Sequence, residues 1–167
     1  MITYIFSWLI SILFVLFIGV IHNHAILKLI DVDIVIVLTV YLLMFYREMH
    51  VGIFAFGQGL IIDVFSGGML GLFALIYLIV FFGIRVASRP LDIYSTVGQM
   101  AVIFIAVLLK NILMILFIHM FSMEIALSSL DFLAFIFSAI CSGLLAPVIF
   151  YLLNLFNRFS ISLNLGI

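Results

Sequence analysis

The chain is a succession of long apolar stretches that short polar segments separate. A helix of about 20 apolar residues crosses a bilayer, because each residue adds about 1.5 Å and the hydrocarbon core is about 30 Å thick. Only 8% of the residues are charged, whereas about a quarter are charged in a typical soluble domain. The pattern predicts an all-α, polytopic integral membrane protein without a globular domain outside the bilayer.

We expect one transmembrane domain over residues 1–167, built as a bundle of six transmembrane helices. The predicted spans are residues 3–21, 34–46, 51–65, 69–84, 97–121 and 131–155. The first is interpreted as a retained span, because no base precedes it and no cleavage pattern follows it.

Six spans would place both termini on the same side of the membrane, and basic residues indicate which side. The loops and tail on that side hold Arg47, Arg85, Arg89 and Arg158, whereas the opposite loops hold only Lys28. Both termini are therefore predicted to be cytoplasmic.

Charge and residue type argue against several functions. The net charge of −1 comes from acids and bases that are scattered singly, so no basic surface is predicted to bind nucleic acid. The single cysteine, Cys141, allows no internal disulfide, and His22-x-His24 lacks a third metal ligand nearby. Ser66 has no nucleophile motif around it. We expect no metal, no cofactor and no enzymatic activity.

The segment Gly57–Gly71 is polar and glycine-rich, although it lies within apolar sequence. It holds one carboxylate, one amide and five glycines, and polar atoms at membrane depth need a partner. We expect the spans on either side of Ser66-Gly67-Gly68 to form a close antiparallel hairpin, because glycine permits a tight turn.

Asp63 and Lys110 are predicted to lie at matching depths, about 18 Å and 20 Å from the cytoplasmic ends of their spans. A lone charge in mid-bilayer is costly, so we expect an ion pair between them, with Asn111 or Gln58 as a further hydrogen-bond partner. The pair would fix the register of two helices. Alternatives are a role in coupling or proton relay, a role in partner binding, or an Asp63 that stays protonated because burial disfavours the charged form.

Small residues recur at helical spacing in two places. Gly67-x-x-x-Gly71, together with Gly57 and Gly59, permits close helix approach, as does the pattern that starts at Ala139 and continues through Gly143 to Pro147. We interpret both as packing surfaces within the chain rather than as docking faces for another protein.

The glycine-rich segment resembles a signature of the rod shape-determining protein MreD family. The family pattern Gly-x-x-x-Asp-x-x-Ser-Gly-x-x-x-Gly-x-x-Ala-Leu matches here at Gly59, Asp63, Ser66, Gly67, Gly71, Ala74 and Leu75. An aspartate shortly before the second span is also typical of the family, and Asp31 or Asp33 would match it. The motif covers about twenty residues, whereas the hydropathy layout covers the whole chain.

The resemblance implies a non-enzymatic scaffold subunit of the cell-elongation machinery in the bacterial cytoplasmic (inner) membrane. It would bind MreC directly and act with MreB, RodA and penicillin-binding protein 2 in lateral peptidoglycan synthesis and rod shape. Its structural or partner-binding residues would be Gly59, Asp63, Ser66, Gly67 and Gly71, to which our residue-based reasoning adds Lys110.

Two other functions remain open from the sequence. The MreD family is thought to share a helical arrangement with the substrate-binding subunits of energy-coupling-factor vitamin transporters, and short glycine-broken spans with an intramembrane carboxylate also fit a small-molecule site. An intramembrane enzyme that depends on Asp63 is the third class, for which the sequence suggests no substrate.

Overall fold

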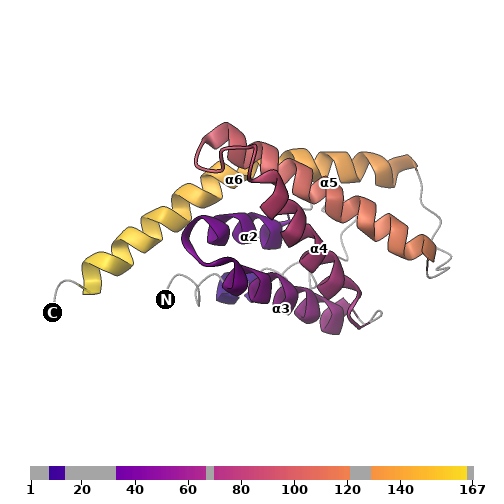
Figure 1. Ribbon diagram of the computed structural model, residues 1–167, viewed down its shortest axis with the longest axis horizontal. Coiled ribbons are helices and arrows are strands. Elements are labelled where there is room, and N and C mark those ends of the chain that lie inside the picture. The colour runs from indigo at the N-terminus through magenta and orange to yellow at the C-terminus, as the bar shows by residue number, and fades with distance from the viewer. Residues whose placement is uncertain (1–7, 14–32, 67–69, 121–128, 165–167) are drawn as a thin grey trace.

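The computed structural model describes residues 8–13, 33–66, 70–120 and 129–164. Within these ranges all regular structure is helical, which confirms the all-α prediction. The labelled helices are α2 (Ile34–Phe45), α3 (Glu48–Ser66), α4 (Leu72–Ala87), α5 (Thr96–Met120) and α6 (Ser129–Asn164) (Figure 1). Residues 8–13 are also helical, and the rest of the predicted first span lies outside the described residues.

Three described helical segments are long and apolar enough to cross a membrane: Glu48–Ser66, Thr96–Phe117 and Leu133–Leu155. The chain is therefore a membrane protein. The α2 and α4 helices are also apolar, but they have only 12 and 16 residues. At about 1.5 Å per residue, α2 measures about 18 Å, which is less than the thickness of the hydrocarbon core.

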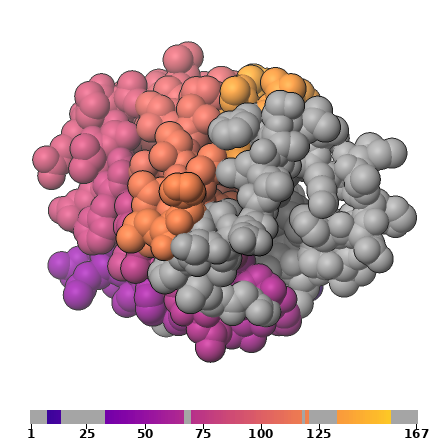
Figure 2. All heavy atoms as spheres, turned by 90° about the vertical axis from the view of Figure 1, so that its right-hand side faces the viewer, coloured from indigo at the N-terminus to yellow at the C-terminus, as the bar shows by residue number. Residues whose placement is uncertain are grey.

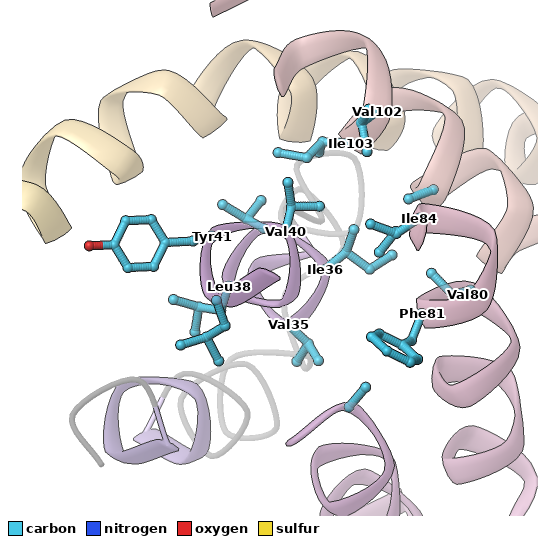
Figure 3. Packing of buried hydrophobic residues seen from close by; sticks show 14 of the residues in the cluster. Val35, Ile36, Leu38, Val40, Tyr41, Val80, Phe81, Ile84, Val102 and Ile103 are labelled. Carbon is cyan, nitrogen blue, oxygen red and sulfur yellow. The ribbon is translucent and has the colours of Figure 1, made fainter. Parts of the chain in front are cut away.

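The short α2 helix lies in the centre of the bundle. Eight consecutive residues, Val35 to Leu42, are buried, and Figure 3 shows α2 end-on with side chains radiating from it toward the surrounding helices. Ile36 and Val40 point toward Ile103 of α5 and Ile84 of α4 (Figure 3). A helix that is apolar on every side can be buried on every side, and α2 supplies much of the core.

The α3 and α4 helices form the close hairpin that the glycine-rich segment predicts. A Cβ atom at Gly59 would stand 2.4 Å from Ala74 Cα, so only glycine permits this approach of the two backbones. At the end of the hairpin away from its turn, Arg85 Nη2 and Glu48 Oε2 form a partly exposed ion pair of 2.6 Å. The turn residues 67–69 lie outside the described residues.

The α5 and α6 helices form a second antiparallel pair. The two helices are in contact, and parts of both reach the face of the molecule that Figure 2 shows. Gly143 of α6 lies against α5, where an added Cβ would be 3.3 Å from the Met100 carbonyl oxygen, and Ala139 is fully buried. The small-residue pattern from Ala139 to Gly143 therefore packs within the chain, as predicted.

The α6 helix bends partway along its length (Figure 1). Pro147 lies inside the helix, where it has no N–H to donate and clashes with the carbonyl of the preceding turn. Proline is the usual cause of such a bend.

Candidate functional site: two buried aspartate clusters

Asp33 is the centre of the first buried cluster. Lys110 Nζ donates to Asp33 Oδ2 at 2.6 Å, and the Tyr77 hydroxyl lies 3.2 Å from both carboxylate oxygens. Asp33 is only 5% exposed and Lys110 only 9%. A buried charge pair of this kind is stable when the remaining polar atoms also find partners, and the tyrosine hydroxyl supplies one.

The same aspartate starts the central helix. Asp33 is the N-cap of α2, where its Oδ1 accepts from the Ile36 N–H at 3.2 Å. A carboxylate suits this position because the first N–H groups of a helix have no partner within it and carry partial positive charge. The Asp33 N–H in turn donates to Ser142 Oγ at 3.1 Å. The cluster therefore joins the start of α2 to α4, α5 and α6.

The second cluster surrounds Asp63, near the C-terminal end of α3. Asp63 is 1% exposed. Its Oδ2 accepts from the backbone N–H groups of Gly71 and Ala74 at 3.0 and 3.1 Å, and its Oδ1 accepts from that of Phe73 at 2.9 Å. These donors belong to the N-terminus of α4, so Asp63 caps that helix from the neighbouring one. The charge is compensated by aligned backbone dipoles.

The predicted ion pair between Asp63 and Lys110 is wrong. Lys110 binds Asp33, and Asp63 binds the start of α4. The predicted hydrogen-bond partners differ as well: Asn111 donates to the Phe135 carbonyl at 3.3 Å, and Gln58 accepts from Ser11 at 2.9 Å. Depth along a helix is fixed by residue count, but the direction in which a side chain points also depends on how the helix is rotated.

The residues of the glycine-rich motif serve the α3–α4 hairpin together. Gly59 makes the close approach, Asp63 caps α4, and Ser66 Oγ donates to the Asp63 carbonyl at 3.2 Å. Gly71, the N-cap of α4, has a φ of 97°, a conformation that glycine adopts without steric cost. Gly67 lies outside the described residues.

The sequence reasoning missed Tyr77 and Ser142 as members of the Asp33 cluster. Tyr77 lies in the apolar part of α4, and Ser142 lies one turn after Ser138 in α6. Polar residues within apolar helices usually face the interior of a bundle. That signal indicates burial but not the partner. Asp33 had a clearer signal, since an aspartate directly before an apolar helical run is a typical N-cap.

In each cluster the carboxylate joins helices of the bundle. Both carboxylates accept several hydrogen bonds: Asp33 connects helices that are distant in sequence, and Asp63 connects α3 to the next helix, α4. In the part of the chain that the structure describes, no group of three or more His, Cys, Asp or Glu residues is arranged to hold a metal ion.

Fold and clusters together define an all-helical membrane protein whose intramembrane acids join helices within the bundle. Neither a protein-family model, nor a curated protein, nor a solved structure matches the chain.

Proposed function

We propose that the protein is an MreD-type scaffold, a non-enzymatic subunit of the bacterial cell-elongation machinery. It would bind the single-pass protein MreC directly and act within a wider complex with MreB, RodA and penicillin-binding protein 2. In this proposal it holds these proteins together in the cytoplasmic membrane and supports lateral peptidoglycan synthesis and rod shape.

The observation that most supports the proposal is the shared role of the motif residues. Gly59, Asp63, Gly71 and Ala74, which carry the resemblance, all contribute to the same junction between α3 and α4. The Asp63 carboxylate of the motif accepts hydrogen bonds from backbone N–H groups of α4. A motif that joins two helices in this way fits a protein that presents a fixed surface to its partners.

The proposal includes six spans and two cytoplasmic termini. Arg85 pairs with Glu48 at one end of the α3–α4 hairpin, and Arg47 directly precedes Glu48 in the chain. Arg89 follows α4 within the connection to α5, so these three arginines gather at one end of the bundle. By the positive-inside rule, that end would face the cytoplasm.

Depletion combined with purification would test the scaffold function. We expect depleted cells of the source bacterium to change from rods to spheres, and we expect the tagged protein to copurify with a single-pass membrane protein that carries an extracytoplasmic coiled coil. Unchanged rod shape together with no such partner would contradict the proposal.

A second candidate is a substrate-binding subunit of an energy-coupling-factor vitamin transporter. The observation that favours it is the start of α2 inside the bundle, beside Lys110 and Tyr77, since helices that begin within a membrane protein often border substrate sites. A thermal-shift screen with vitamins separates the two functions: a vitamin that raises Tm at micromolar concentration would favour transport, and the scaffold function predicts no such shift.

A further inference from the structure

The amide of Gln58 lies at the contact between α3 and the helical residues 8–13. Gln58 and Ser11 are both fully buried, and Ser11 Oγ donates to Gln58 Oε1 at 2.9 Å. The other end of the amide, Nε2, is buried and has no hydrogen-bond partner. An amide turned by 180° would place its nitrogen against Ser11 and leave its oxygen without a donor, so one end lacks a protein partner in either orientation.

The helix turn that carries Gln58 is closely packed on the faces of its two neighbours in the chain. Gly57 is covered by the indole of Trp8, which would lie 2.4 Å from an added Cβ, and Gly59 is covered by Ala74. Trp8 also packs edge-to-face on Phe54, with ring centroids 5.4 Å apart.

We propose that a water molecule is a structural component of this contact and binds the free end of the Gln58 amide. A buried polar atom without a partner is costly, especially at membrane depth, and buried waters typically bond such atoms. Gln58 lies ten residues from the start of α3, about 15 Å along the helix. Water suits the site because it can accept from the amide nitrogen and donate to a lone pair of the Ser11 hydroxyl.

Selective labelling of glutamine side chains tests this directly, because the chain has only two glutamines, Gln58 and Gln99. The protein would be reconstituted in lipid nanodiscs with 15N in its glutamine amides, and magnetisation transfer from water would be recorded. Gln99, in the first turn of α5, is itself buried at 9% exposure and serves only to separate the two side-chain signals. We expect transfer from water to the Gln58 amide, and no transfer to that amide would overturn the proposal.

Stability provides a second readout that does not need the resonances. If the amide is hydrated, the apolar double variant Ser11→Ala/Gln58→Met loses satisfied hydrogen bonds, and its Tm should be equal to or below that of the wild type. If the amide end were instead dry and unpaired, the double variant would remove a buried polar atom without a partner. A Tm at least about 2 °C above the wild type would then contradict the bound water.

Discussion

Two buried aspartates in this protein are stabilised by different means. Asp33 faces a cation, Lys110, at 2.6 Å, whereas Asp63 faces three backbone N–H groups at the start of α4. Both arrangements lower the cost of a carboxylate in the bilayer, because a helix N-terminus carries partial positive charge as an ammonium group carries a full one. Each acid therefore fixes the position of one helix end.

Removal of the Asp63 carboxylate should destabilise the protein through the α4 N-terminus. Asp63→Ala leaves three N–H groups without their acceptor, which we expect to cost about 2 kcal/mol or more. The matched control is Asp92→Ala, since Asp92 Oδ1 accepts from the Tyr94 N–H in an exposed loop; its expected loss is well below 1 kcal/mol. Thermal melting in nanodiscs compares the two, and equal losses would refute the buried cap.

The sequence shows that Asp63 and Lys110 must be partnered, but it does not identify their partners. The predicted second span begins directly after Asp33, so residue counts match only Asp63 to the depth of Lys110 and leave Asp33 in a loop. The choice depends on helix rotation and on which helices are neighbours, and both are set by packing of the whole bundle.

At the scale of helices, the α3–α4 hairpin depends on one small residue more than on the others. Gly59 lies against the Ala74 backbone, which cannot move aside without displacing α4. Gly52, on the same helix, lies against the Phe81 ring, whose Cε1 would be 3.3 Å from an added Cβ. A ring can shift slightly, so this second contact tolerates a methyl group.

Alanine substitution should therefore change stability at one of these two positions and not at the other. We expect Gly59→Ala to lower stability by about 1–3 kcal/mol because it forces the two backbones apart. Gly52→Ala should be close to neutral, because helix propensity favours alanine over glycine by about 1 kcal/mol and offsets the small adjustment of Phe81. Melting temperatures of the two variants decide this, and a stable Gly59→Ala protein would contradict the close approach.

The hairpin was predictable because it follows from local chemistry, whereas the position of α2 was not. Glycines beside a single acid indicate a tight junction between helices that are adjacent in the chain. In contrast, the apolar sequence from Val35 to Leu42 would look the same in a helix that faces lipid and in one enclosed by other helices. Its central position becomes visible only when the helices are assembled.

At the scale of the whole molecule, the proposed topology makes a prediction about the bundle ends. Reporter fusions that fluoresce only in the cytoplasm should be active at both termini and in the connection between α4 and α5, which holds Arg89. Fusions between α5 and α6 should be inactive. Activity at only one terminus would show an odd number of spans and would refute the six-span arrangement.

The exposed surface of the bundle is mainly apolar, and this suits both lipid and partner helices. The glycines that promote close helix contact are already used within the chain: Gly57 by Trp8, Gly59 by Ala74 and Gly143 by α5. A partner such as the proposed MreC helix would therefore pack on the larger exposed side chains, for example Ile53 and Phe56 of α3 or Leu144 of α6.

Intramembrane charges hold the helices of this bundle in place, and Lys110 binds Asp33 rather than Asp63. Double-mutant cycles in nanodiscs test it most directly, with Asp33→Asn, Asp63→Asn and Lys110→Met alone and in pairs. We expect Lys110→Met to cost about 3–5 kcal/mol because it leaves Asp33 without its cation. The Asp33–Lys110 cycle should show a coupling of about 2 kcal/mol, whereas Asp63 and Lys110 should be additive within about 0.5 kcal/mol. Strong coupling of Lys110 to Asp63, with none to Asp33, would contradict the account.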